Sequence, residues 1–314
     1  MISITFKEVI SMKRCMIFIC GIVLYLVISI NPYPGLAMTN DEIAAQLREY
    51  IEKNQTDPIE PRLDPVFEFV PGLKGLEIDY ELSYQNMLAS GRFDRSLIVS
   101  HSIDYKENPI QFRGHPMYKG NEKGNYVSLL INVAWGEKEL DEMIKILDQL
   151  DVKASFFFEG RYAEKHPDQV REIHNKGHLI GNHSYSHPAR WGTYTYDQYK
   201  EEIVKTNDVL SAIIDETIIY FAPPAGEFND TTLKAAADQG MYSILWTADT
   251  IDWRGDPAHV LISRVLKKEQ PGALILMHPK PETVIALEPL VTQLRELGYQ
   301  FKTVEQMITG ERLF

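Results

Sequence analysis

Two histidines, His183 and His187, stand four residues apart, directly after an apolar segment typical of a strand and directly before Pro188. Imidazoles at this spacing can converge on one cation, and nitrogen ligands favour zinc. The pair could instead cap a loop or bond to backbone carbonyls. Its place at the end of a predicted strand favours the metal-binding interpretation.

Polar residues also follow two other apolar segments. His278 comes directly after the segment 273–277 and could act as a general acid or lie at the edge of a core. Asp249 and Asp252 follow an earlier segment, where they could cap a turn or take part in acid–base chemistry. Trp253 could pack in a core or form the wall of a binding site.

The composition limits the partners of the chain. Its 314 residues contain 32 Lys and Arg against 44 Asp and Glu, a net charge of −12, so phosphate backbones repel it and no nucleic-acid partner is expected. Both cysteines, Cys15 and Cys20, lie in an apolar N-terminal segment. The rest of the chain can therefore form no disulfide or cysteine-based zinc site, and a metal would need His, Asp or Glu ligands.

Apolar runs alternate with amphipathic segments after residue 125, which predicts a parallel sheet covered by helices. The predicted strands cover 127–134, 154–158, 179–182, 218–222, 242–248, 273–277 and 299–304. The predicted helices cover 137–150, 162–176, 195–214, 229–239, 257–269 and 283–297. An open doubly wound sheet and a closed barrel both fit this pattern. The first strand is not followed by a glycine-rich phosphate-binding motif, which favours the barrel, with its chemistry at the carboxyl ends of the strands.

The N-terminal third of the chain reads differently. Lys13 and Arg14 precede an apolar run, so we interpret residues 1–37 as a signal peptide or an N-terminal membrane anchor. Either would place the rest outside the cytoplasm, secreted or membrane-anchored, with membrane contact only through this segment. Residues 38–124 are interrupted by prolines and are predicted to form a small irregular accessory segment or linker, followed by the barrel over 125–314.

The strand-end residues, taken in order, resemble the polysaccharide deacetylases of carbohydrate esterase family 4, which carry the nodulation-protein-B homology domain. The likeness rests on the motifs at His183–His187, Asp249–Trp253 and Leu276–His278 and spans about residues 125–310. The lead-in sequence is similar to the sporulation-associated subgroup. The resemblance implies a distorted (β/α)7 barrel that removes N-acetyl groups from an amino-sugar polysaccharide, peptidoglycan or chitin-like, with zinc or another divalent metal.

The resemblance also implies a role for each strand-end residue. A metal would polarise the acetamide carbonyl and a water, an aspartate would act as base, and a histidine would protonate the leaving amine. The matching residues are His183 and His187 for the metal, His278 for the acid, Asp252 for its orientation, Trp253 and Leu276 for the acetate methyl group, and the Ala225 amide for the oxyanion.

The chain departs from the family pattern at the first strand. The paired aspartates of the family, base and metal ligand, fall on Asn132 and Val133, and the arginine that partners the base falls on Ala222. The loss is coherent, because an arginine without its carboxylate would be an unpaired charge.

Three hypotheses are therefore open. The chain could be a working metal-dependent N-deacetylase in which another carboxylate, such as Glu137, completes the metal site. It could be an inactive glycan-binding or regulatory protein of sporulation or cell-wall assembly. It could also be another barrel hydrolase that uses Asp249 and Asp252 as paired carboxylates, although three residues of separation is short for that chemistry.

Overall fold

A computed structural model describes residues 37–312, so the predicted signal or anchor segment lies outside the described residues apart from its last position. Contacts divide the chain into two units. One contains residues up to Lys53 together with Ile78–Val99, and the other contains Asn54–Glu77 and Ser100–Phe314. The domain boundaries predicted from the sequence stay predictions. Among the described helices, none combines the length and apolar character needed to cross a bilayer.

The first unit is a small helical body. Helices α2 (Asn40–Asn54) and α3 (Tyr80–Ser90) supply its hydrophobic core cluster, Ile43, Leu47 and Met87. The Asp79 carboxylate caps α3 by accepting a hydrogen bond from the Leu82 amide. A 3₁₀ turn, η1, follows at Arg95–Leu97.

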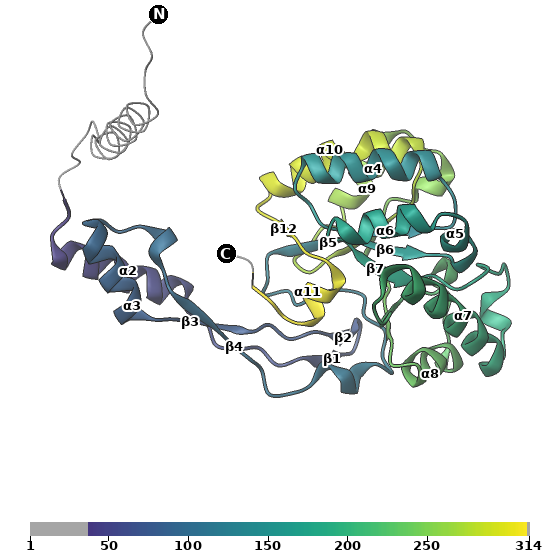
Figure 1. Ribbon diagram of the computed structural model, residues 1–314, viewed down its shortest axis with the longest axis horizontal. Helices are drawn as coiled ribbons and strands as arrows, with labels where there is room; N and C mark the ends of the chain where they lie inside the picture. Colours follow the sequence, from purple (N-terminus) through teal and green to yellow (C-terminus); the bar gives the residue numbers. More distant parts are fainter. Residues whose placement is uncertain (1–36, 313–314) are drawn as a thin grey trace, which may run out of the picture. The chain divides into compact units, whose positions relative to one another are not determined.

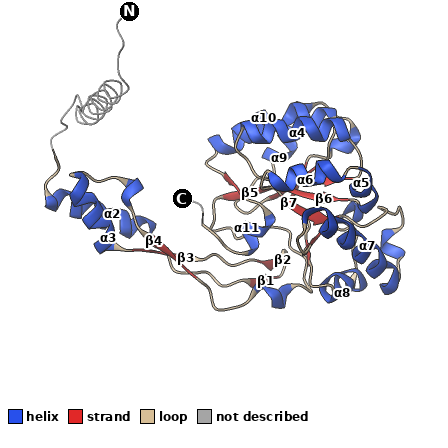
Figure 2. Ribbon diagram, viewed as in Figure 1, coloured by secondary structure: helices blue, strands red, loops and turns tan. Residues whose placement is uncertain are grey.

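The second unit is built on a curled parallel sheet, drawn in red in Figure 2. Its strands pair in the order β10, β11, β5, β6, β7, β8, β9, and β12 pairs alongside β5. The bounds are β5 (Tyr126–Val133), β6 (Ser155–Phe158), β7 (Leu179–Asn182), β8 (Tyr220–Phe221), β9 (Tyr242–Ser243), β10 (Ala248–Asp249), β11 (Leu274–Met277) and β12 (Gln300–Phe301). The parallel sheet predicted from the sequence is thus confirmed.

The barrel is open between β9 and β10, which stand at opposite ends of the strand order. The single strand predicted over 242–248 is therefore wrong. The chain forms two residues of β9, leaves the sheet, and returns as two residues of β10 on the other side of the opening. A continuous apolar run does not reveal such a break, because residues of both short strands and of the crossing are buried.

Helices connect the strands and cover the outside of the sheet. Their bounds are α4 (Glu137–Gln149), α5 (Gly160–Lys165), α6 (Pro167–Asn175), α7 (Tyr196–Ile214), α8 (Asp230–Asp238), α9 (Ala258–Leu266), α10 (Pro281–Glu296) and α11 (Val304–Ile308). In Figure 1, α4 and α10 lie side by side over the strands. The single helix predicted over 162–176 is two helices, because Pro167 has no amide hydrogen and starts a new helix.

Alternation along the strands gives the sheet two buried faces. On β5, Val127, Leu129, Ile131 and Val133 pack with the helices in one cluster. Leu130 belongs to a second cluster on the inner face. The part of the chain before β5 helps to close that inner face, since Phe69, Phe112 and Met117 belong to the same cluster.

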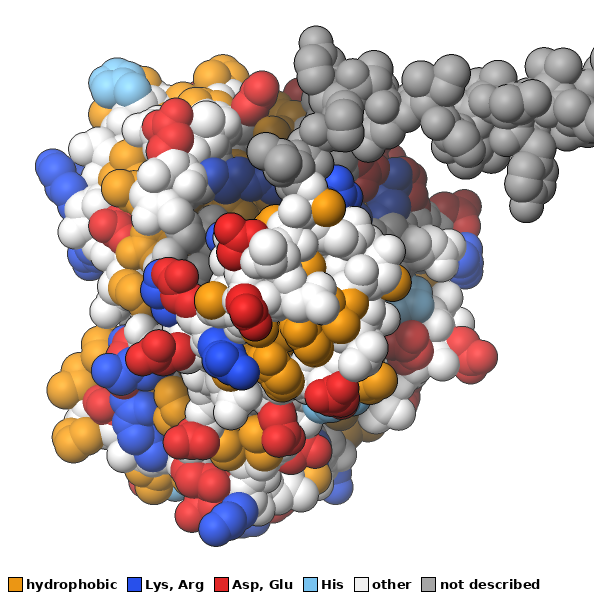
Figure 3. Space-filling view, turned by 90° about the vertical axis from the view of Figure 1, so that its left-hand side faces the viewer, with side chains coloured by type: hydrophobic (Ala, Val, Ile, Leu, Met, Phe, Trp, Pro, Cys, Tyr) orange, Lys and Arg blue, Asp and Glu red, His pale blue; other side chains and the backbone are white. Residues whose placement is uncertain are grey.

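The lead-in part of this unit contains short strands as well as loops. Strands β1 (Arg62–Asp64) and β2 (Glu68–Val70) form an antiparallel hairpin, and β3 (Gly75–Ile78) pairs with β4 (Ser100–Ile103). On the face drawn in Figure 3, acidic and basic side chains are interspersed. This face therefore presents no broad basic surface.

Candidate functional site

The loop after β7 carries the two histidines and is held by a carboxylate from α7. One carboxylate oxygen of Glu202 accepts hydrogen bonds from the amides of Tyr185 (2.9 Å) and Ser186 (2.8 Å). Its other oxygen accepts a bond from the Ser186 hydroxyl (2.7 Å). Sequence reasoning missed Glu202, because it lies on the following helix, 16 residues after Ser186, and no local pattern connects it with the loop.

Asn182 fixes the start of the same loop. Its side-chain amide donates to the Ile203 carbonyl and to Asn207 on α7, and its carbonyl oxygen accepts from the Ser184 amide. Two loop residues adopt the left-handed region, Ser184 at φ 63° and His187 at φ 44°. Backbone in that region is unfavourable for non-glycine residues, so the surrounding bonds hold the loop in a conformation it would not adopt alone.

The structure brings His183 and His187 together, with ring centroids 4.9 Å apart. The Nδ1 of His183 lies 2.7 Å from the Ala222 carbonyl oxygen, so Nδ1 carries the hydrogen and Nε2 keeps a free lone pair. Burial, reinforced by His187, lowers the pKa of His183 to about 3. Burial also lowers the pKa of His187, so both rings are neutral near pH 7, as metal ligands must be.

The two histidines do not complete a metal site. Zinc takes three or four protein ligands, and in the described part of the chain no group of three or more His, Cys, Asp or Glu side chains could hold an ion. Glu137, the substitute ligand considered from the sequence, is directed elsewhere: its carboxylate lies 3.6 Å from Nδ1 of His166. The donor set present is therefore too small for the metal that the family resemblance implies.

The acid side of the site is assembled around Asp252. One carboxylate oxygen lies 2.8 Å from Nδ1 of His278, and the other accepts bonds from the His278 amide (2.6 Å) and the Thr283 hydroxyl (2.8 Å). Burial on its own raises the pKa of Asp252, but the bonds from His278 and Thr283 outweigh burial and lower it. At neutral pH an ionised Asp252 therefore orients the ring of His278.

This arrangement argues against Asp249 and Asp252 as a hydrolytic carboxylate pair. Both oxygens of Asp252 are engaged by His278 and Thr283, which leaves neither free to attack or protonate a substrate. Asp249 is half-buried, and burial raises its pKa.

Trp135, which follows β5, is an unexpected member of the site. Its indole stacks on the imidazole of His278, with centroids 5.7 Å apart and planes inclined by 12°. The ammonium of Lys280 lies 5.2 Å from the indole centroid. The sequence predicted no role for Trp135, although an aromatic residue directly after a predicted strand end is a signal for a position at the site.

Successive side chains at the end of β5 point to opposite faces of the sheet. Val133 is fully buried in the helix-side cluster, so its side chain points away from the histidines. Asn132 faces the opposite way and is buried, with its Oδ1 atom lacking a hydrogen-bond partner. Asn132 pairs in register with Phe157 and, through it, with Gly181, two residues before His183.

Ala134, the residue directly after β5, lies at the same height along the sheet as His183. Val133, Phe158 and Asn182 are aligned across the sheet, so the residues that follow them, Ala134 and His183, leave the sheet at the same height. Ala134 is half-buried and Trp135 is 39% exposed, so both are accessible from the carboxyl end of the sheet.

The remaining predicted site residues lie near or after the carboxyl ends of β8, β10 and β11. Ala222, at the arginine position, is buried on the inner face and accepts the bond from His183. Ala225 adopts a left-handed conformation at φ 55°. Leu276 is 4% exposed, whereas Trp253 is 63% exposed. The roles assigned to these residues stay predictions.

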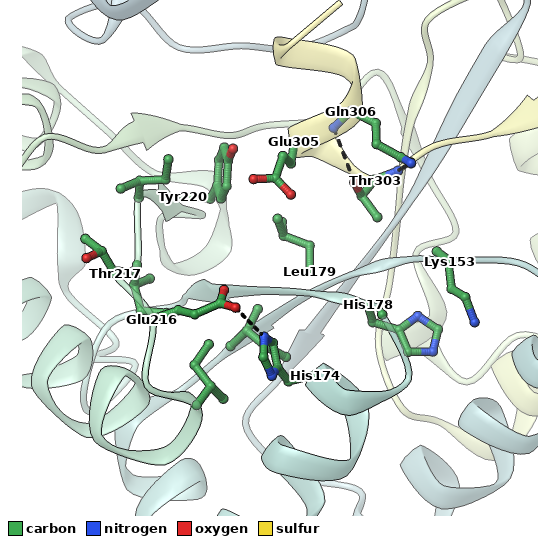
Figure 4. A pocket seen from close by; sticks show the side chains of 15 residues that line it. Lys153, His174, His178, Leu179, Glu216, Thr217, Tyr220, Thr303, Glu305 and Gln306 are labelled. Atoms are coloured by element: carbon green, nitrogen blue, oxygen red, sulfur yellow. Dashed lines mark hydrogen bonds and ion pairs between the residues drawn. The ribbon is translucent and has the colours of Figure 1, made fainter. Parts of the chain in front are cut away.

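A cavity of about 300 Å³ opens at the other, amino end of the strands, before β7 and β8 (Figure 4). It is lined by residues including Lys153, Tyr220 and Glu305, and His174 and Glu216 form an ion pair of 3.1 Å at its wall. None of the predicted site residues lines this cavity.

Comparison with known proteins agrees with the geometry. The sequence profile of the polysaccharide deacetylase family matches residues 119–244. A peptidoglycan-N-acetylglucosamine deacetylase of Bacillus cereus is 38% identical over 259 residues, covering 76% of this chain and 94% of that protein. The uncharacterized protein YlxY of Bacillus subtilis is 36% identical over 275 residues, 88% of this chain and 86% of its own.

Solved structures of similar proteins include one that is described as a pseudoenzyme. The crystal structure of wild-type BA3943 from Bacillus anthracis, described as a carbohydrate esterase family 4 pseudoenzyme, superposes with a TM-score of 0.79 at 33% identity, covering 86% of this chain and 96% of that one. A BA3943 mutant described as having restored enzymatic activity gives a TM-score of 0.78 at 32% identity, covering 86% and 99% of the two chains. The curled parallel sheet, the strand-end histidines and these relatives show together that the chain belongs to the polysaccharide deacetylase family.

Proposed function

We propose that this polysaccharide deacetylase-like protein binds amino-sugar glycans of the cell wall at the carboxyl end of its sheet without deacetylating them. The observation that carries the proposal is the combination of an intact acid pair, Asp252 with His278, and an incomplete metal and base side. A family member with these features would recognise the polymer but could not activate a water molecule.

The residues present can perform one half of the family reaction. His278, oriented by Asp252, can hold a proton for a leaving amine at Nε2, because Nδ1 faces the carboxylate. On the water side, neither Asn132, whose amide cannot accept a proton, nor Ala134, which lies at the height of His183, can serve as a base. General-base assistance is worth about 10²–10⁴-fold in rate, so its loss alone leaves a weak catalyst.

The second missing part is the metal. In this family a divalent ion supplies Lewis-acid polarisation of the acetamide and of water. His183 and His187 offer two neutral nitrogens, and the described residues contain no third ligand for them. We therefore propose no metal-dependent step for this chain.

The relatives support the proposed substrate class. The Bacillus cereus relative is a peptidoglycan-N-acetylglucosamine deacetylase, and another relative, PdaA of Bacillus subtilis, is a peptidoglycan-N-acetylmuramic acid deacetylase. We propose peptidoglycan as the glycan and an extracytoplasmic location, secreted or anchored through residues 1–37. A role in sporulation or wall assembly is part of the same proposal.

The test compares metal content, acetate release and glycan binding on one protein preparation. We expect the chain to sediment with insoluble peptidoglycan, to release no acetate from it, and to retain no more zinc by mass spectrometry than a His183→Ala/His187→Ala variant. Acetate release that requires zinc and disappears in the double variant would show a working deacetylase and overturn the proposal. Failure to sediment with peptidoglycan would overturn its binding part.

A further inference from the structure

We propose that Trp135 is a carbohydrate-binding residue, whose exposed indole face receives a pyranose ring of the glycan directly above the acid His278. The inference rests on the proposed function and deepens it, since it names the surface that holds the polymer. The site would then bind the glycan by stacking against Trp135 and would not transfer a proton to it.

The indole of Trp135 is held in a fixed position. Trp135 stacks on His278 at 5.7 Å, and His278 is itself held through both its ring and its amide by Asp252. The next residue, Gly136, has φ +86°, and a Cβ there would lie 2.5 Å from the Pro279 carbonyl oxygen. The two loops therefore pack backbone against backbone, and the indole needs little ordering when a ligand arrives.

Two indoles near His278 are exposed to solvent. Trp135 is 39% exposed although one of its faces is covered by an imidazole. Trp253, directly after the aspartate that holds His278, is 63% exposed. Leaving two indoles in water forgoes the free energy of burying them, and large exposed apolar groups gathered near a polar site mark binding surfaces.

The indole face and a sugar ring are chemically complementary. One face of a pyranose ring in an amino-sugar polymer presents C–H groups, and these match the negative face of an indole. The hydroxyl and acetamido groups on the ring edge need polar partners. Lys280 provides one, since its ammonium lies over the indole at 5.2 Å from the ring centroid.

The stack also changes what His278 can do. Its side chain is 14% exposed, and one ring face is occupied by the indole. A ligand ring placed on the outer face of Trp135 is separated from the imidazole by the thickness of the indole. The same residue that binds the glycan thus keeps it away from the acid.

The experiment measures the affinity of the protein for a soluble N-acetylglucosamine tetramer by titration calorimetry, and sedimentation with peptidoglycan in parallel. We expect Trp135→Ala to weaken binding by about tenfold or more, as aromatic anchors of interfaces do, and Trp135→Phe to lose less. Ile285→Ala is the matched control, because Ile285 is 67% exposed on α10 and should not affect binding.

Fluorescence provides a reading on protein that keeps Trp135. In a Trp253→Phe variant, Trp135 is the exposed tryptophan left in the described part of the chain, and the tetramer should shift its emission to shorter wavelength. If Trp135→Ala bound the tetramer as tightly as the wild-type protein, or if the emission did not shift at saturating tetramer, the role of Trp135 would be overturned. Glycan binding itself would not be. Absence of wild-type binding to both the tetramer and peptidoglycan would instead refute the proposed function itself.

Discussion

Asp252 and His278 are joined twice, once through the ring Nδ1 at 2.8 Å and once through the backbone amide at 2.6 Å. One buried carboxylate therefore sets both the orientation of the imidazole and the path of the chain at the end of β11. The pair is as much a structural element as a chemical one, and its loss should be visible in stability.

Asp252→Asn should lower the free energy of unfolding by about 2 kcal/mol at pH 7, because a charge-assisted network would become a set of neutral bonds. The folded state lowers the pKa of Asp252, so its contribution is present above the unfolded pKa and is lost as pH falls through the folded value. Urea unfolding should show the two proteins converging below about pH 4. A difference independent of pH would show that charge is not its source.

Glu202→Ala should destabilise the chain by about 2–3 kcal/mol, since three hydrogen bonds to one carboxylate are removed from the histidine loop. Glu201→Ala is the control, because Glu201 is the exposed neighbour of Glu202 on α7 and carries the same charge. Thermal unfolding of both variants measures the effect. Equal melting temperatures would mean that the loop does not depend on this clamp.

Val133→Asp should cost the fold more than 3 kcal/mol or prevent folding, because it places a carboxylate in the helix-side core. Ala134→Asp should be tolerated, since Ala134 is half-buried at the carboxyl end of the sheet. Circular dichroism and urea unfolding of the two variants decide between the positions. A stable Val133→Asp protein would contradict the register of β5.

A triple variant, Ala134→Asp, Trp135→Asp and Ala222→Arg, should take up about one zinc ion per chain, because it places carboxylates at the height of His183 and gives one of them a cationic partner. Mass spectrometry of the purified protein measures the ion, and adding His183→Ala should remove it. Acetate release from peptidoglycan is the second reading. Zinc uptake by the alternative set, Asn132→Asp, Val133→Asp and Ala222→Arg, would favour the positions inferred from sequence.

Lys302→Met should stabilise the protein by about 2 kcal/mol at pH 7. The Lys302 ammonium is fully buried with no hydrogen-bond partner and sits 3.7 Å from the ring centroid of Tyr126. Burial lowers its pKa to about 8, so the cost of keeping it charged is present below pH 8 and is relieved as pH rises toward the unfolded value. The advantage of Lys302→Met in chemical unfolding should shrink by pH 10.

Most of the fold could be predicted from the sequence, because buried parallel strands are long apolar runs and the helices between them are amphipathic. The break between β9 and β10 could not, since burial on both sides of the crossing keeps the run apolar. The division of the helix at Pro167 was visible in principle, as proline cannot continue a helix without losing a backbone bond.

The site was predicted unevenly for a physical reason. His183, His187 and the Asp252–His278 pair follow strand ends, where spacing alone indicates proximity. Residues that act across the sequence, such as Glu202, leave no local signal. The side-chain direction of Val133 depends on the register of β5, which a single sequence does not determine.

The clamp of Glu202 on the loop between the two histidines has a consequence for how this fold can change. A loop shaped by hydrogen bonds from its own chain requires no ion to stay in shape, so chemistry and architecture can be inherited separately. Substitutions at the end of β5 can abolish the reaction while the surface that would bind the polymer keeps its shape. That surface can then serve for binding alone.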